Sequence, residues 1–361
     1  MKIAYFVHLN MGPKSGVYKK ILTQIDAWQE LGNVARLFVV TKNKDVSSAL
    51  NEIKKDNIEI FNYGKKVKGK YFDERILIFS QAGKHVIEWK PDIVYTRQDL
   101  YYPPLKRLYE VCRVVIEVNT NDNNEIWIEN KIKWFYNKLT RNILFKRAAG
   151  LVFVSKEISN SPSYIKFKKP SIVISNSIDL SKFKSAPEKN PSDDIRFVFI
   201  GNNNCPWHGV DKIIFLAKKK KDWNFELIGV FPNDSKPSNV NYHGQKSRDA
   251  YESLIYRADV GIGTLALHRI KMNETSSLKI REYLAYGLPV IIGCKDTDFP
   301  NGADFILELP NTEKNVENSI SLIQQFITKW KGKHVPRSEI SHLDVKYKEE
   351  NRIEFLKSII K

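Results

Sequence analysis

The sequence lacks long hydrophobic runs and has little cysteine. No stretch approaches the roughly 20 apolar residues that a membrane-spanning helix needs. The first residues, MKIAYFVHLN, form too short an apolar run for a signal peptide and are typical of a first β-strand. The three cysteines, Cys112, Cys205 and Cys294, do not have the spacing of metal ligands. These absences favour a protein of the reducing cytoplasm without a cysteine metal site.

Acidic residues are also fewer than basic ones. The chain has 58 Lys and Arg against 41 Asp and Glu, a net charge of +17. Such a charge suits nucleic acid, an anionic membrane surface or an anionic substrate, and lysines spread over loops and helix faces explain it equally well. No nucleic-acid-binding motif occurs, so we expect no nucleic-acid partner. With 361 residues and 42% hydrophobic residues, we expect a globular protein of two domains.

Strand-like and helix-like segments alternate along the whole chain, which predicts an α/β protein with parallel sheets. In the first half the expected strands are 2–9, 35–41, 57–63, 92–97 and 113–119, and the expected helices are 17–32, 72–89, 104–112 and 131–150. In the second half the expected strands are 195–202, 224–230, 239–244 and 258–265, with helices at 210–220, 248–257 and 341–361. A polar, proline-containing stretch at 184–194 predicts a linker between them. We therefore expect domains at 1–185 and 186–340, followed by a last helix at 341–361.

The helix expected at 131–150, KIKWFYNKLTRNILFKRAAG, is both basic and apolar. Ile132, Phe135, Leu139 and Ile143 fall on one side at helical spacing, and lysines and arginines cover much of the remainder. Two interpretations stay open. Either the apolar stripe packs on the protein's own sheet, or it dips into an anionic membrane while the lysines bind headgroups.

The segment 273–290, NETSSLKIREYLAYGLPV, predicts a short helix with clear ends. Gly287 suits the left-handed position after a helix, and Pro289 prevents continuation. A helix start offers free N–H groups and the positive end of a dipole, which together can bind a phosphate. The residues that can cap this start are Thr275, Ser276 and Ser277.

Two acids with seven residues between them, Glu274 and Glu282, flank that helix start. Glu274 is expected just before the helix and Glu282 about two turns inside it. The two acids can hold opposite ends of one phosphorylated ligand. The alternative is a surface helix with two solvated acids.

This segment resembles the E-x7-E motif of retaining GT-B glycosyltransferases of family 4, and EYLAYGLPVI resembles the usual continuation. The stretch SIVISNSIDLSKF (171–183) is similar to the pattern N-G-[IV]-D-x-x-x-F that closes the first domain in that family, with Ser177 in place of the glycine. The glycine after 195–200, the segment NVNYHG (239–244) and the strand starting ADV (258–260) are also similar to landmarks of its donor domain.

The resemblance implies the GT-B fold, in which two Rossmann-like domains face each other across a cleft and the C-terminal helix crosses back to the first domain. It also implies a nucleotide-sugar donor, retention of anomeric configuration, and neither a metal nor a further cofactor. Glu274 would lie beside the donor sugar, Glu282 would hold the ribose, and Lys279 would contact the donor phosphates; Glu274 and Lys279 are our catalytic candidates. The triplet Asp-Thr-Asp at 296–298 is interpreted as a loop and not as a metal site.

The loop at 201–209 departs from the family pattern. Where many relatives have an arginine and a lysine for the phosphates, this chain has Asn202, Asn203 and His208. A histidine with an ordinary pKa is only partly cationic at neutral pH. His208 can still donate a hydrogen bond to the donor, or it packs beside Trp207 without a binding role.

The loop after the first strand contains glycines but not the dinucleotide fingerprint G-x-G-x-x-G. It is either a plain turn or a close approach of backbone to the donor, and the resemblance favours the second. The expected donor-binding residues are Gly12, Ser15, Gly16, Asn202, Asn203, His208, Thr275, Ser276, Ser277, Leu278 and Glu282. Polar residues after two strands of the first domain are the acceptor-side candidates, namely Arg97, Asn119, Asn121 and Asp122.

The leading hypothesis is a glycosyltransferase that moves a sugar from a nucleoside-diphosphate sugar to a saccharide or lipid-linked acceptor. The charge and the resemblance favour bacterial cell-surface polysaccharide synthesis, with a cytoplasmic protein lying peripherally on the inner face of the membrane. Two alternatives remain open: a nucleotide-sugar epimerase or hydrolase on the same scaffold, and a basic binding protein without catalysis.

Overall fold

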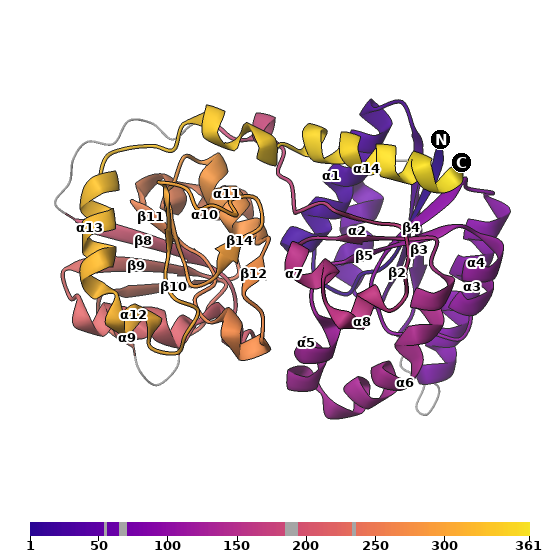
Figure 1. Ribbon diagram of the computed structural model, residues 1–361, viewed down its shortest axis with the longest axis horizontal. Coiled ribbons are helices and arrows are strands. Elements are labelled where there is room, and N and C mark those ends of the chain that lie inside the picture. Colours follow the sequence, from indigo (N-terminus) through magenta and orange to yellow (C-terminus); the bar gives the residue numbers. More distant parts are fainter. Residues whose placement is uncertain (54–55, 65–70, 185–193, 233–235) are drawn as a thin grey trace. The chain divides into compact units, whose positions relative to one another are not determined.

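The computed structural model describes residues 1–361 except 54–55, 65–70, 185–193 and 233–235. The chain divides into two compact units, coloured by sequence in Figure 1. Unit 1 contains residues 1–174 together with 345–361, and unit 2 contains residues 175–344. Almost all of the linker expected at 184–194 lies outside the described residues. Residues 175–184 belong to unit 2 and include Asn176, Ile178 and Asp179 of the closing pattern.

Unit 1 is built on a sheet of seven parallel strands in the order β3-β2-β1-β4-β5-β6-β7. The strands are β1 Lys2–His8, β2 Val34–Thr41, β3 Ile58–Asn62, β4 Ile93–Arg97, β5 Val114–Val118, β6 Gly150–Phe153 and β7 Ser171–Val173. Its helices are α1 Gly16–Glu30, α2 Lys44–Glu52, α3 Tyr71–Glu88, α4 Leu105–Val111, α5 Asp122–Glu129, α6 Lys131–Arg147, α7 Lys156–Ser159, α8 Pro162–Ile165 and α14 Val345–Ile360. The five strands expected up to residue 119 are confirmed, whereas α2 and α5 were not anticipated.

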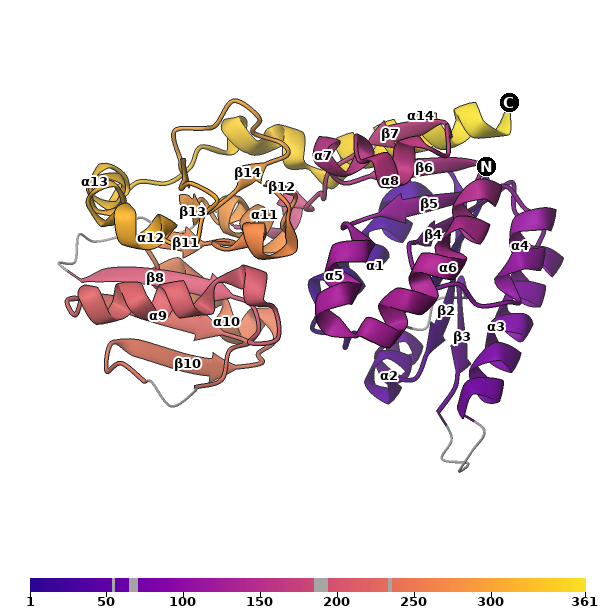
Figure 2. The same cartoon turned by 60° about the horizontal axis from the view of Figure 1, so that its bottom comes forward.

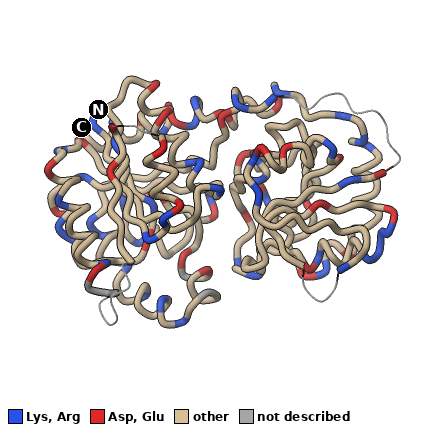
Figure 3. Tube along the Cα trace, turned by 180° about the vertical axis from the view of Figure 1, so that it is seen from behind, with Lys and Arg blue, Asp and Glu red and all other residues tan. Residues whose placement is uncertain are grey.

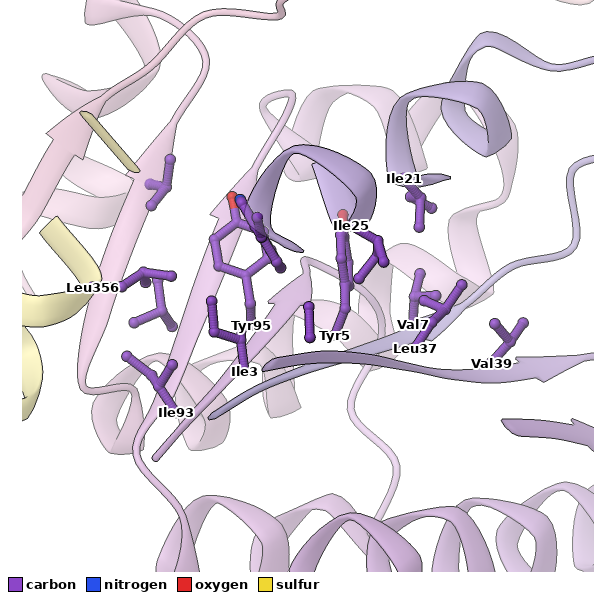
Figure 4. Close-up of a cluster of buried hydrophobic side chains, with 14 of the residues drawn as sticks. Ile3, Tyr5, Val7, Ile21, Ile25, Leu37, Val39, Ile93, Tyr95 and Leu356 are labelled. Carbon is purple, nitrogen blue, oxygen red and sulfur yellow. The ribbon is translucent and has the colours of Figure 1, made fainter. Parts of the chain in front are cut away.

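The central strands of the unit 1 sheet, which are apolar at nearly every position, are buried on both faces, whereas the edge strands β3 and β7 are only half-buried. On β1, Ile3, Tyr5 and Val7 point toward α1, where they meet Ile21 and Ile25, as Figure 4 shows. Phe6 points to the opposite face, where its ring lies edge-on to that of Phe79 of α3. The continuous apolar run of β1 is therefore explained by a core on each side.

The last helix, α14, packs on unit 1 although about 170 residues of unit 2 separate it from the rest. The Trp28 indole donates to Oε2 of Glu349 at 2.7 Å, and the same oxygen accepts from Arg352 Nε at 2.8 Å. Arg352 also donates to the Tyr95 hydroxyl at 2.5 Å, and Leu356 is fully buried. The expectation that the C-terminal helix returns to the first domain is confirmed.

The buried ion pair of Arg352 and Glu349 leads to a prediction about the stability of the fold. Replacing Arg352 with leucine leaves Glu349 buried without its cation, so we expect a loss of about 3–5 kcal/mol in the free energy of unfolding. Urea unfolding measures it, and Lys357→Leu on the exposed side of α14 is the control, expected to change stability by less than about 0.5 kcal/mol. A similar small loss for Arg352→Leu would show that the pair does not hold α14 in place.

Unit 2 has a second sheet, of six parallel strands in the order β10-β9-β8-β11-β13-β15, seen in Figure 2. The strands are β8 Ile195–Ile200, β9 Trp223–Ile228, β10 Val240–Gly244, β11 Val260–Ile262, β13 Val290–Ile292 and β15 Ile306–Glu308. The helices are α9 Val210–Lys219, α10 Arg248–Arg257, α11 Leu278–Ala285, α12 Asn315–Asn318 and α13 Ile320–Trp330. A short separate pair joins β12 Glu274–Thr275 to β14 Lys295–Asp296.

In both sheets the first strand of the unit is central and the chain then winds outward in both directions, which is the Rossmann order. The order reverses between β1 and β4 in unit 1 and between β8 and β11 in unit 2. In such sheets ligands bind at the carboxyl ends of the strands near the reversal point. Among the described helices none is both long and apolar enough to cross a membrane.

Candidate functional site

The reversal point of unit 2 lies where the loops after β8 and β11 meet. The loop after β8 contains a 3-10 turn at Pro206–His208. The carbonyl of His208 accepts a hydrogen bond from Leu265 N at 3.2 Å, and that of Trp207 accepts one from Ala266 N at 3.0 Å. These two bonds fix the His208 loop against the loop that follows β11.

Helix α11 starts at this edge and lies close against the sheet. The Ile200 N–H at the end of β8 donates to the Tyr283 hydroxyl at 2.7 Å. A Cβ at Gly261 would lie 2.5 Å from the Tyr283 ring, so only glycine on β11 allows this approach. Gly287 has φ +78°, the left-handed conformation expected after the helix, so this expectation is confirmed.

The start of α11 is not capped by a side chain. Ser277 occupies the N-cap position but its hydroxyl makes no capping bond. The Ser276 hydroxyl instead accepts from Asn176 N at 2.7 Å and from Arg281 Nη2 at 3.2 Å. The expected cap position is therefore confirmed at Ser277 but its capping bond is not, and the first N–H groups of α11 keep their capacity to bind an anion.

Two cations in the first turn of α11 have different surroundings. Arg281 is fully buried and binds Asp296 through two bonds of 2.7 and 2.8 Å and Asp298 at 2.6 Å. Its charge is thus satisfied within the protein, and the acids of the 296–298 triplet hold the start of the helix in place.

Lys279 is the second cation. Its Nζ is buried and has no hydrogen-bond partner among the residues that the structure describes, and the residue as a whole is half-buried. Nζ lies 4.3 Å from the centroid of the Phe199 ring. Burial lowers the pKa of Lys279 to about 7, against a weaker opposite effect of Cys205 and Cys294. A buried ammonium without a partner is unfavourable, and a bound anion would remove that cost.

His208 lies near Lys279 and is not a second cation. Burial, with the charge of Lys279 adding to it, lowers the pKa of His208 to about 2. The ring is therefore neutral at physiological pH, unlike a histidine of ordinary pKa, and its role as a hydrogen-bond donor stays a prediction. The Asn202 N–H points to Nδ1 at 3.5 Å, which leaves Nε2 to carry the proton as a hydrogen-bond donor.

The two asparagines of this loop shape it. The Asn203 amide bridges to the next loop, accepting from Phe231 N and donating to Phe231 O, both at 2.9 Å. The Asn202 side chain accepts from Asn204 N at 2.8 Å. Both residues lie with His208 after β8, as expected, but these contacts give their amides a structural role.

The two glutamates are placed as the sequence indicated, one before the helix and one inside it. Glu274 lies in β12, which pairs with β14, and Thr275 follows it in the same strand. Glu282 lies in the second turn of α11, and its Oε1 accepts from the Tyr251 hydroxyl at 2.7 Å. Burial, then the charge of Glu282, raise the pKa of Tyr251. Tyr251 of α10 thus fixes the Glu282 carboxylate, a contact that the sequence did not reveal.

The remaining donor-binding candidates belong to unit 1, after β1. Ser15 is the N-cap of α1 and accepts from Tyr18 N at 3.2 Å, while its own N–H donates to the Gly12 carbonyl at 2.9 Å. Gly16 is the first residue of α1. A Cβ at Gly12 would meet nothing closer than 3.9 Å, so packing alone does not require glycine there.

Three of the four acceptor-side candidates line one pocket of about 390 Å³ in unit 1, beyond β4 and β5. They are Arg97, Asn119 and Asp122. Asp122 is buried and already accepts hydrogen bonds from Arg141, Asn137 and Tyr164, so it serves the structure. The fourth candidate, Asn121, starts α5, and its buried Oδ1 has no partner among the described residues.

The patterns in the sequence did not predict a polar cluster that the structure shows at the reversal point of unit 1. His8 Nδ1 lies 2.6 Å from Asp99 Oδ2, and His8 Nε2 lies 2.7 Å from the Tyr63 hydroxyl. Asp99 also lines the 390 Å³ pocket, together with Lys133. The sequence could have indicated this cluster through the positions of its residues, because His8 ends β1 and Asp99 follows β4, and these two strands are neighbours at the centre of the sheet.

No family model matches the sequence. Methionine–tRNA ligase of Borrelia hermsii is 25% identical over 280 residues, which are 74% of this chain and 35% of that protein. The chain thus spans about a third of the length of this relative.

Solved structures match the whole chain. HepE of Anabaena, in complex with UDP and glucose, has a TM-score of 0.69, 12% identity, and coverage of 99% of this chain and 100% of that one. The lipopolysaccharide outer core galactosyltransferase WaaB has a TM-score of 0.66, 13% identity and 99% coverage of both chains. UDP-GlcNAc 2-epimerase of Neisseria meningitidis, bound to UDP-GlcNAc, has a TM-score of 0.62, 12% identity, and coverage of 99% and 100%. The chain therefore has the GT-B fold: two Rossmann-like α/β domains, with the C-terminal helix packed on the first.

Proposed function

We propose that the protein is a glycosyltransferase that moves a sugar from a nucleoside-diphosphate sugar to an acceptor, with the donor bound by unit 2. The observation that carries this proposal is the Lys279 ammonium, whose buried Nζ has no hydrogen-bond partner among the described residues. It lies in the first turn of α11, where the N-cap residue Ser277 makes no capping bond with its side chain. A diphosphate would satisfy both the ammonium and the free N–H groups.

Each neighbouring side chain then has a role in holding the donor. Lys279 and the start of α11 stabilise the negative charge that develops on the leaving diphosphate, and this arrangement needs no metal. His208, neutral and protonated on Nε2, donates one further hydrogen bond. Glu282, fixed by Tyr251, accepts from the ribose hydroxyls. Glu274 lies beside the sugar and stabilises positive charge at its anomeric carbon, with retention of configuration.

The solved structures support the donor class, since HepE holds UDP and glucose and the Neisseria epimerase holds UDP-GlcNAc. The acceptor in our proposal is a saccharide or a lipid-linked saccharide that uses the pocket beside Arg97 and Asn119. A role in bacterial cell-surface polysaccharide synthesis, at the inner face of the membrane, belongs to the same proposal.

A nucleotide-sugar epimerase is the second candidate, because an epimerase shares this fold over the whole chain. The two are distinguished by incubating the donor sugar nucleotide without an acceptor. An epimerase returns an intact sugar nucleotide with a new sugar configuration, whereas a transferase leaves the configuration unchanged or slowly releases free nucleotide.

A thermal-shift panel of UDP, GDP, ADP, TDP, CMP and methionine tests the proposed donor. A ligand of the folded state stabilises it by about 2.7 kcal/mol at one hundred times its Kd. We expect one diphosphate to raise the melting temperature of the wild type and to have little effect on Glu282→Ala. Glu317→Ala, which removes an exposed carboxylate of α12, is the matched control and should respond like the wild type.

Two outcomes would contradict the proposal. No shift with any nucleotide would favour a basic binding protein without catalysis. A shift with methionine alone would favour an activity closer to that of the Borrelia relative.

A further inference from the structure

Five large apolar side chains are exposed together on α5 and α6. On α6, Ile132 is 83% exposed, Phe135 60% and Leu139 64%. On α5, Trp127 is 46% and Ile128 43% exposed. The two helices pack on each other at the lower margin of unit 1 in Figure 1. We call these five residues the apolar ridge.

The buried face of α6 carries apolar side chains, Leu144 and Phe145, only in its second half, and polar side chains in its middle. Asn137 and Arg141 are buried there, and both donate to the buried Asp122 carboxylate at the start of α5. Arg141 makes two parallel bonds to it, both of 3.0 Å. Turning the stripe of Ile132, Phe135 and Leu139 inward would break these bonds. The interpretation that the stripe packs on the protein's own sheet is therefore wrong for these three residues, whereas Ile143, the fourth residue of the stripe, is half-buried.

Basic side chains border the ridge, and α6 contains no acid. At 100° per residue, Lys131 and Lys138 lie on one side of the apolar stripe and Lys133 and Arg147 on the other. Figure 3 shows Lys and Arg recurring along this part of the chain. On α6 the ridge thus combines an apolar strip with a border of positive charge, whereas α5 also carries Glu125.

Two tryptophans lie at one end of the ridge. The rings of Trp127 and Trp134 are 4.9 Å apart, edge to face, and a lysine lies over each of them. Lys131 Nζ is 5.5 Å from the Trp127 centroid, and Lys138 Nζ is 4.9 Å from that of Trp134. Tryptophan beside lysine is the combination found at the boundary between lipid tails and headgroups.

We propose that the apolar ridge docks on an anionic membrane surface, with its apolar side chains among the acyl chains and its lysines on the headgroups. A second copy of this chain fits less well, because a symmetric interface would bring the basic borders together. Docking does not require the proposed glycosyl transfer.

The docking surface adjoins the pocket proposed for the acceptor. Lys133 and Asn137 of α6 line that pocket, and the ridge lies on the outer side of the same helix. If the protein is a glycosyltransferase, an acceptor anchored in the same bilayer would find its saccharide next to the pocket. This consequence, unlike docking itself, rests on the proposed function.

Sedimentation of the full chain with phosphatidylcholine vesicles, with and without phosphatidylglycerol, tests the docking. We expect binding only to the anionic vesicles, and weaker binding at high salt. The triple variant Ile132→Ser, Phe135→Ser, Leu139→Ser should bind at least about tenfold more weakly. A matched triple variant of exposed apolar residues elsewhere, Leu77→Ser, Val111→Ser, Leu322→Ser, should bind like the wild type.

Two measurements separate docking from folding and from catalysis. Both triple variants should keep the melting temperature and the nucleotide-induced shift of the wild type. Unchanged binding by the ridge variant, or no binding by the wild type, would overturn the proposal whatever the nucleotide panel shows. A concentration-dependent dimer that only the ridge variant abolishes would also overturn it, in favour of a second copy.

Discussion

Replacing Lys279 with methionine is expected to lower donor turnover by about 100-fold or more, the usual effect of removing one stabilising group from a developing anion. The same change should make the unliganded protein more stable. The buried Nζ has no hydrogen-bond partner among the described residues, and methionine fills a similar space without a charge. Turnover is measured as release of the nucleotide that the thermal-shift panel identifies, and stability by urea unfolding.

The pH dependence of the free energy of unfolding tests the predicted cost of burying the Lys279 charge. The pKa of Lys279 is lowered to about 7 in the folded protein, below the value of about 10.4 for an unfolded lysine. Between these values the unfolded chain binds more protons. Stability therefore rises with pH between these two values, by up to about 1.4 kcal/mol per pH unit. The cost of burying the charged Lys279 side chain is fully present below pH 7. Lys279→Met should lack this contribution.

Donor affinity should have the opposite pH dependence. The cationic form of Lys279 binds the diphosphate, so affinity for the sugar nucleotide should fall as pH rises above about 7. Titration calorimetry in two buffers of different ionisation enthalpy should detect proton uptake on binding in the wild type and not in Lys279→Met. Lys221→Met, which removes an exposed lysine, is the control. If Lys279→Met keeps the turnover of the wild type, Lys279 does not contact the donor.

The fold was predictable because parallel strands buried on both faces carry continuous apolar runs, as in β1 and β5. The end of α11 was predictable for a local reason, since Gly287 and Pro289 act through their own backbone. The start of α11 falls after Ser277, one of the three expected caps, but the contact of the Ser276 hydroxyl was not predictable, because it binds Asn176, which is 100 residues away. A capping rule considers neighbours in sequence only.

The candidate site shows the same limit. Lys279 and Arg281 are both basic residues near one helix start, and the sequence favoured Lys279 only through the resemblance. The two cations differ because Asp296 and Asp298, which follow β13 in the chain, form ion pairs with Arg281 and not with Lys279. Likewise, the periodicity of α6 defines an apolar stripe but does not say whether the stripe faces the protein core or the solvent. The buried bonds of Arg141 to Asp122 decide that direction.

Glu274→Gln is expected to lower turnover strongly and to spare donor binding. Glutamine keeps the shape of the side chain and removes only the charge, so we expect turnover to fall by about 100-fold or more and nucleotide affinity to stay within about twofold. The fold should survive because backbone bonds hold this segment, Lys295 N to Asn273 O at 2.8 Å and Thr297 N to Thr275 O at 3.1 Å. Glu317→Gln should behave as the wild type, and equal losses of turnover and affinity would instead make Glu274 a binding residue like Glu282.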